Sequence, residues 1–75
     1  MPQDSASERL WRVRKQHVWI DARLRDRVAS GDVELQYFYE GQLVIATRWP
    51  TRDAAIGDAT ARLRELQRVG WNTHW

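Results

Sequence analysis

The sequence contains no cysteine, which excludes disulfide bonds and thiolate metal sites. It has only two prolines and four glycines, so clear turn and break signals fall at few positions. No stretch approaches the roughly 20 apolar residues that a membrane-spanning helix requires. The first residues carry acids and lack the apolar run of a secretory signal. We therefore expect a cytoplasmic protein.

A chain of 75 residues fits one domain, close to the size at which a single core is barely sufficient. That length leaves little room for a deep catalytic cleft. We expect a disordered tail at 1–8, a single domain at 9–71 and a C-terminal tail at 72–75. Five tryptophans are many for so short a chain, and such residues serve both cores and binding surfaces.

Positive charge is concentrated in the first third of the chain. The net charge is +2, yet residues 9–27 hold seven basic residues against Asp21 and Asp26, an excess of five. All basic residues except Lys15 are arginines. Two explanations stay open: the composition of a GC-rich genome, or a surface that binds anions.

The segment from Trp49 to Trp71 has the strongest local pattern and predicts a helix. Pro50 disfavours helical backbone at the residue before it, and Thr51 is a preferred N-cap residue. Gly70 can adopt the left-handed conformation that ends a helix. The apolar positions recur at helical spacing and form one narrow stripe. These positions are Ile56, Ala59, Leu63 and Leu66.

The stretch 10–24 is rich in β-branched and aromatic residues and predicts a hairpin that turns at Lys15–Gln16. One continuous bent strand is the alternative, and it would change every pairing. The hairpin would put Val13 opposite Val18 and Trp11 opposite Ile20 on one face. On the other face it would put Arg12 opposite Trp19 and Arg14 opposite His17.

Residues 26–32 predict a loop, and two strands at 33–39 and 42–48 flank a turn at Glu40–Gly41. Pairing across this turn puts Leu35, Tyr37, Val44 and Ala46 on one face. It puts Phe38, Leu43 and Ile45 on the other face. The predicted fold is therefore α+β: a small antiparallel β-meander of three or four strands, with one C-terminal helix packed on one face. The expected core joins the first of these faces, with Trp11, Val13, Val18 and Ile20, to the helix stripe.

The sequence lacks the patterns of an active site or a metal site. His17 and His74 are the only histidines, and a metal site would need both together with distant carboxylates. The serines have no nearby base, and the glycines do not form a phosphate-binding pattern. We expect no enzyme activity, no cofactor and no small-molecule substrate.

The favoured functional hypothesis is a small binding module for protein interaction or self-association. Large apolar side chains would then remain on the sheet face that the helix does not cover: Trp19, Phe38, Leu43 and Ile45. A contiguous patch of that kind usually marks an interaction site. We expect a homodimer or a protein partner on this face, unless residues 72–75 fold over it.

The alternative hypothesis is a DNA- or RNA-binding domain that uses the N-terminal hairpin. The candidate residues are Arg12, Arg14, His17, Trp19, Arg23 and Arg25. Strands followed by one helix, with arginines and a tryptophan on the free face, resemble phage-integrase arm-binding domains and plant ethylene-response-type domains. That resemblance implies contact between the sheet and DNA. The double-stranded-RNA-binding domain is also similar in outline, but the chain has Thr51–Arg52–Asp53 where that family has clustered lysines.

Overall fold

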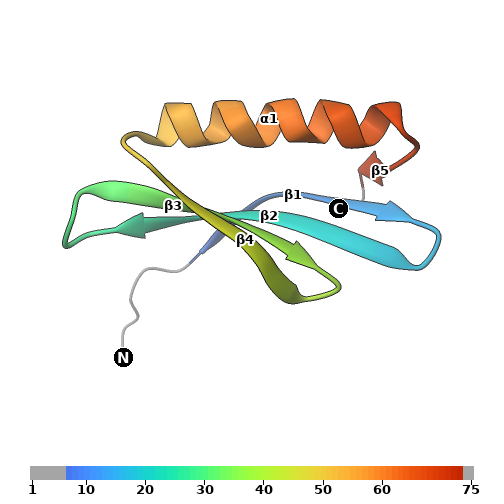
Figure 1. Ribbon diagram of the computed structural model, residues 1–75, viewed down its shortest axis with the longest axis horizontal. Helices are drawn as coiled ribbons and strands as arrows, with labels where there is room; N and C mark the ends of the chain where they lie inside the picture. Colours follow the sequence, from blue (N-terminus) through green and yellow to red (C-terminus); the bar gives the residue numbers. More distant parts are fainter. Residues whose placement is uncertain (1–6, 74–75) are drawn as a thin grey trace.

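Five antiparallel strands and one helix form an α+β fold in the computed structural model, which describes residues 7–73. The elements are β1 Glu8–Lys15, β2 Val18–Arg27, β3 Asp32–Tyr39, β4 Gln42–Trp49, α1 Arg52–Arg68 and β5 Asn72–Thr73. The strands lie in the order β4-β3-β2-β1-β5, and α1 lies along one side of the sheet (Figure 1). The predicted antiparallel sheet with a C-terminal helix is confirmed.

The sheet has five strands, and not the three or four that we predicted. The additional strand is β5, which pairs with Val13 and Arg14 of β1. The sequence predicts a tail at Asn72 and Thr73, because two residues after a helix carry no strand pattern. They pair along the edge of the sheet and do not fold over its uncovered face. Of the predicted disordered tail at 1–8, residues 1–6 lie outside the described residues, and the prediction is wrong at Glu8, which begins β1.

The first hairpin turns at Gln16–His17, one residue later than predicted, and the continuous bent strand is excluded. Gln16 adopts a left-handed φ of 59°, which the primed hairpin turns require. Lys15 stays within β1, where its Nζ donates a hydrogen bond to the carbonyl of Val69 at 3.0 Å. The predicted partners are therefore wrong. The observed pairs are Lys15 with Val18, Arg14 with Trp19, Val13 with Ile20 and Arg12 with Asp21.

Moving the turn by one residue moves each strand partner by two residues. Because side chains alternate with a period of two, the predicted faces of the hairpin survive this change. Val13 and Ile20 still face the helix, and Arg12 and Arg14 still face away from it.

The second hairpin turns at Glu40–Gly41, as predicted, with φ angles of 54° and 81°. Positive φ at both central residues is the signature of a type I′ turn. Beyond this turn the pairing skips Val44, so that Phe38 pairs with Leu43 but Tyr37 pairs with Ile45. An extra residue of this kind is a β-bulge, and it reverses the faces of the residues that follow it.

The bulge at Val44 overturns the predicted faces of β4. Ile45 lies opposite Tyr37, on the side of the helix, and not beside Phe38. Ala46 pairs with Gln36 and faces away from the helix. Val44 is 57% exposed, so it does not belong to the core as predicted.

The core lies between α1 and the helix-facing side of the sheet. Its buried members are Trp11, Val13, Ala22, Leu24, Val33, Leu35, Tyr37, Ala55 and Ala59. Ala55 and Ala59 are the two buried helix residues, and their small side chains let α1 approach the strands closely. Ile56, Leu63 and Leu66 of the predicted stripe pack against this cluster from its margin. Val18 is outside the cluster, contrary to the prediction.

Both predicted ends of the helix are confirmed. The Thr51 side chain caps the N-terminus by accepting a hydrogen bond from the backbone N–H of Ala54 at 3.1 Å. At the other end, the N–H of Trp71 donates to the carbonyl of Leu66 and the N–H of Gly70 donates to that of Gln67. These two bonds form a Schellman motif, in which Gly70 has a φ of 105°.

We predict that Gly70→Ala lowers the free energy of unfolding by about 1–2 kcal/mol, because a side chain strains left-handed backbone. Gly57 provides the matched control: it lies inside α1 without positive φ, and an added Cβ would meet no atom within 4 Å. Gly57→Ala should therefore stabilise the fold by about 0.5–1 kcal/mol. Urea denaturation measures both effects. Equal effects of the two substitutions would contradict the observed helix end.

Candidate functional site

The sheet side opposite α1 collects arginines from three strands, and we call it the arginine face. Strand alternation creates it, because every second residue of β1, β2 and β4 points away from the helix. The arginines of this face are Arg9, Arg12, Arg14, Arg23, Arg25 and Arg48. Arg27, the last residue of β2, points to the same side but forms an ion pair with Asp32 opposite it and is not counted among them. Residues that lie up to 39 positions apart in the sequence thereby share one surface.

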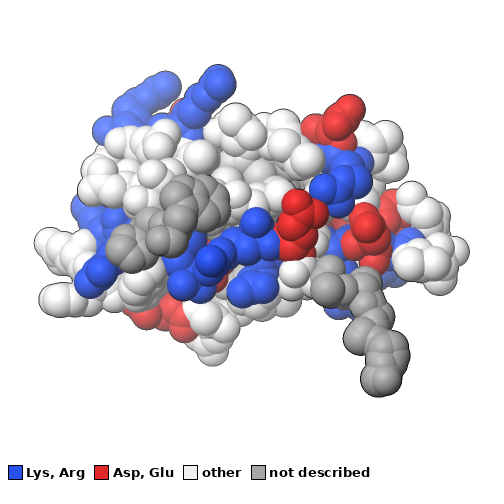
Figure 2. Space-filling model, turned by 180° about the vertical axis from the view of Figure 1, so that it is seen from behind, with Lys and Arg blue, Asp and Glu red and all other residues white. Residues whose placement is uncertain are grey.

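Positive charge dominates the arginine face. Apart from the Arg27–Asp32 pair, its acids are Asp21 and Glu34, so six arginines against two carboxylates leave an excess of four positive charges. Asp21 pairs with Arg12, and Glu34 lies 4.0 Å from Arg25. Seen from behind, lysine and arginine side chains form a band across the middle of the molecule, and acidic side chains lie toward the right and at the lower left edge (Figure 2).

Aromatic rings hold the arginine side chains in place. The guanidinium groups of Arg12 and Arg14 each lie 5.0 Å from the centre of the Trp19 ring. Arg23 lies 5.7 Å from the centre of the Phe38 ring. Cation–π contacts of this length restrict the rotamers of the arginines. The guanidinium groups are thus ordered before any ligand arrives.

The Arg12–Asp21 pair is the most structured interaction on this face. Arg12 donates from Nε to Oδ1 and from Nη2 to Oδ2 of Asp21, the second bond at 2.8 Å. Asp21 is only 7% exposed. Its pKa lies below the ordinary value because Arg12 hydrogen-bonds its carboxylate, although burial opposes this effect, and the charges of Arg23 and Arg9 add to the lowering. The carboxylate therefore stays ionised and fixes Arg12.

Arg9 and Arg23 lie directly opposite each other on β1 and β2. Like charges at paired positions destabilise a sheet unless an anion lies between or near them. Arg23 donates a hydrogen bond to Ser7 Oγ at 3.2 Å. Within residues 7–73, no ion pair joins Arg9, Arg14 or Arg23 to a carboxylate. Arg14 Nε donates to the backbone carbonyl of Gln16 at 2.9 Å. The other N–H groups of these three arginines are available to an external anion.

Most of the predicted nucleic-acid residues share this face, with one exception and two additions. Arg12, Arg14, Trp19, Arg23 and Arg25 lie together on it. His17 does not, because it lies in the hairpin turn. The prediction missed two members, Arg9 and Arg48.

Both omissions have a structural reason. A bulge at Leu10 shifts the register between Arg9 and Trp11 and turns Arg9 onto the arginine face. The adjacent apolar pair Leu10–Trp11 breaks the alternation of β1 and is the sequence signal for that bulge. Arg48 reaches the face because it pairs with Glu34, and the bulge at Val44 sets that register.

The four residues predicted to form an apolar interaction patch do not lie on one face. Trp19, Phe38 and Leu43 are on the arginine face, and Ile45 is on the other side of β4. The rings of Trp19 and Phe38 also carry arginine guanidinium groups.

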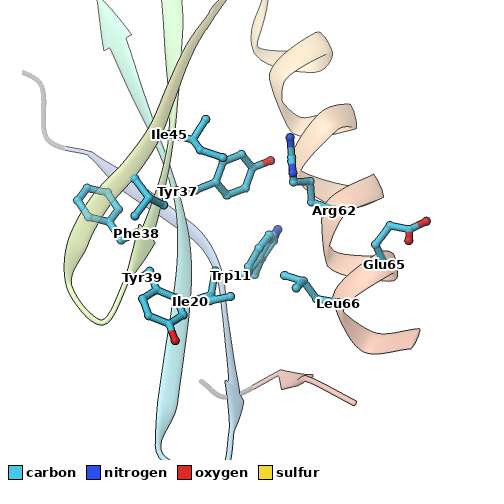
Figure 3. A pocket seen from close by; sticks show the side chains of 10 residues that line it. Trp11, Ile20, Tyr37, Phe38, Tyr39, Ile45, Arg62, Glu65 and Leu66 are labelled. Atoms are coloured by element: carbon cyan, nitrogen blue, oxygen red, sulfur yellow. The ribbon is translucent and has the colours of Figure 1, made fainter. Parts of the chain in front are cut away.

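The second candidate surface is a concave one on the helix side, between α1 and the β3–β4 hairpin. We call it the β4 groove; its volume is about 230 Å³ and its walls include Trp11, Tyr37, Ile45 and Leu66. Ile45 lies beside Tyr37 toward the helix, whereas Phe38 lies farther from it (Figure 3).

Polar groups close one side of this groove. The Tyr37 hydroxyl donates to Asp58 Oδ2 at 2.9 Å, and Arg62 lies 5.2 Å from the centre of the Tyr37 ring. Burial raises the pKa of Tyr37 and the bond to Asp58 raises it further, so the hydroxyl remains a donor. Apart from Arg62 and Glu65, the residues that line the groove are apolar or aromatic.

Neither surface contains a recognisable metal site. Among residues 7–73, no three histidine, aspartate or glutamate side chains gather where they could bind one ion. His74, the second histidine considered, lies outside the described residues. In the same part of the chain, no helix is long and apolar enough to cross a membrane.

No family model, curated protein or solved structure matches this chain. Its function must therefore be argued from the two surfaces themselves.

We predict that Asp21→Asn lowers the free energy of unfolding near pH 7 by about 1–3 kcal/mol, because it leaves Arg12 without its charged partner. The pKa of Asp21 is depressed in the folded protein, so its contribution is present above the unfolded value of 3.8 and is lost as the pH falls through the folded value. The difference between wild type and variant should therefore narrow below about pH 4.

Glu34→Gln is the control for this experiment. It removes the longer and more exposed ion pair with Arg25, so it should cost no more than about 1 kcal/mol. Urea denaturation at several pH values measures both variants. A difference between wild type and Asp21→Asn that stays constant down to about pH 2 would contradict the predicted role of the ionised carboxylate.

Proposed function

We propose that the protein is a small non-enzymatic binding module that holds nucleic acid, DNA or RNA, through the phosphate groups on the arginine face. The observation that carries this proposal is the convergence of six arginines on one sheet face that the helix leaves open. Guanidinium groups bind phosphate through two parallel hydrogen bonds, which makes arginine well suited to this ligand.

The arrangement of the arginines supports phosphate binding over simple solvation. Arg14 and Arg23 are held by aromatic rings and not by carboxylates, so a phosphate does not have to displace an internal acid. The opposed pair Arg9 and Arg23 would be relieved by an anion between them. Ordering the side chains in advance reduces the entropy lost on binding.

The contacts available on this face favour recognition of the backbone over recognition of base sequence. Phosphate contacts position a protein on nucleic acid without reading its sequence. Trp19, one of the candidate nucleic-acid residues, already contacts the guanidinium groups of Arg12 and Arg14. We therefore propose that its role is to hold these arginines, and that affinity depends little on sequence.

A protein partner on the same face has less support. Of the four apolar residues expected there, Ile45 lies on the other side and Trp19 and Phe38 are covered by guanidinium groups. Leu43, which is 49% exposed, is the remaining large apolar side chain. A single exposed leucine is ordinary for a protein surface.

We predict that the double substitution Arg14→Gln, Arg23→Gln weakens binding to a fluorescent oligonucleotide by at least about tenfold at low salt. The slope of log affinity against log salt should also fall by about two, because two phosphate contacts are lost. Fluorescence anisotropy with single-stranded DNA, duplex DNA and RNA measures both quantities.

The double substitution Arg64→Gln, Arg68→Gln is the matched control, because it removes the same charge from exposed positions of α1. It should change affinity only slightly through the net charge. The proposal fails if the wild type binds none of the three nucleic acids at low salt. It also fails if the two double variants weaken binding equally.

A further inference from the structure

Strand β4 forms an open edge of the sheet within the described residues. It lies last in the strand order, whereas the opposite edge strand, β1, carries β5 along part of its length. Every residue from Gln42 to Arg48 is exposed, and Arg48 is the one charged residue in this eight-residue strand. An uncapped, largely uncharged edge is a template for another strand.

The regular part of this edge is short. The bulge at Val44 interrupts it on one side, and Pro50, which has no N–H to donate, follows it on the other. The segment Ile45–Trp49 between them has unbroken alternation. Ile45, Thr47 and Trp49 face the helix side, while Ala46 and Arg48 lie on the arginine face.

We propose that β4 pairs antiparallel with β4 of a second copy of this chain, with Thr47 of each copy at the centre. The site of association is therefore the sheet edge, on neither of the faces considered above. This inference does not depend on the proposed binding of nucleic acid.

The alternation of faces determines the register. Paired residues lie on the same face of a sheet, so a two-fold axis between identical strands must pass through a residue position. A centre at Arg48 would put this residue opposite the partner's Arg48, which is destabilising. A centre at Ile45 or Ala46 would run into the bulge after one or two positions.

Only a centre at Thr47 pairs all five residues of Ile45–Trp49 without placing Arg48 opposite the partner's Arg48 and without reaching the bulge at Val44. It places Ile45 opposite the partner's Trp49 and Ala46 opposite the partner's Arg48. Each Arg48 then keeps Glu34 as its neighbour on β3 within its own sheet. This match of the strand to itself is the reason to assign the edge to a second copy and not to a foreign strand.

The same register covers apolar surface at the mouth of the β4 groove. Ile45 is 39% exposed and lines that groove (Figure 3). Contact with the partner's Trp49 would bury more of the Ile45 side chain. The two-fold symmetry would repeat this contact, so it would occur twice in each dimer. Five paired residues nevertheless make a small interface, so the dimer should be weak, with dissociation constants of about 10–100 µM.

Pairing at this edge would also enlarge the arginine face. The two-fold axis of an antiparallel strand pair runs perpendicular to the sheet, so both helices lie on one side and both arginine faces on the other. The two five-stranded sheets would become one continuous sheet. A longer anionic polymer could then contact both copies.

Charge substitutions at Thr47 test the register directly. Thr47 is exposed, and its Oγ1 accepts a hydrogen bond from Trp49 Nε1 at 2.9 Å. In Thr47→Lys, and equally in Thr47→Glu, like charges would face each other across the two-fold axis. We expect the full-length wild type to show concentration-dependent dimers in sedimentation velocity between about 10 and 500 µM, and each variant to associate at least about tenfold more weakly.

An equimolar mixture of Thr47→Lys and Thr47→Glu should restore association, because opposite charges then face each other. Both variants lose the same bond to Trp49, so restoration isolates the charge effect, and circular dichroism verifies that each is folded. Val28→Lys, at an 87% exposed loop position, should associate like the wild type.

Three results would each overturn the proposal. The first is a wild type that remains monomeric at about 500 µM. The second is association of both Thr47 variants at wild-type strength, which would place the interface elsewhere. The third is a mixture that associates no better than its components. None of these results bears on binding of nucleic acid by a single copy.

Discussion

The buried contact between Trp11 and the middle of α1 joins the helix to the sheet. Trp11 Nε1 donates a hydrogen bond to the carbonyl of Ala59 at 2.9 Å across 48 positions of sequence. Its ring lies 6.0 Å from that of Tyr37, and both are almost fully buried. A buried indole N–H without a partner would be costly, so this bond sets how the helix crosses β1. The hydrogen bond from Tyr37 to Asp58 and the ion pairs of Arg52 with Glu8 and Asp26 join α1 to the sheet at further points.

This arrangement decides what the other sheet face can do. Since the helix covers one face, strand alternation sends the intervening residues to the open side, where β1 and β2 provide arginines. Within residues 7–73, no second layer covers these arginines. Aromatic rings and two carboxylates stabilise the arginines instead, but leave an excess of positive charge. An open, positively charged face is thus a direct result of the fold.

Much of the fold could be predicted from local sequence signals. Thr51 and Gly70 mark the ends of the helix, and Glu40–Gly41 marks a turn, because each meets a specific backbone requirement. The predicted position of the first turn was wrong by one residue. Gln16 adopts positive φ in this turn but is not a residue type that indicates such a turn.

The composition of the two faces was harder to predict. The bulges at Leu10 and Val44 each reverse the side chains beyond them, moving Arg9 onto the open face and Ile45 off it. In β1 the adjacent apolar residues Leu10 and Trp11 interrupt the alternation and so indicate the bulge. In β4 the run Leu43–Val44–Ile45 is apolar throughout, so no pattern shows where the extra residue lies. A single extra residue therefore changes which side chains share a face, although it leaves the order of strands and helix unchanged.

Side-chain NMR of the arginine Nε–Hε and tryptophan indole groups during addition of a single-stranded oligonucleotide tests the role of the open face most directly. Signals of Arg9, Arg14, Arg23 and Trp19 should shift at low salt, while the indole of Trp11, bound to Ala59, should stay unchanged. Shifts confined to the arginines of α1, or no shifts at all, would contradict the assignment of binding to the arginine face.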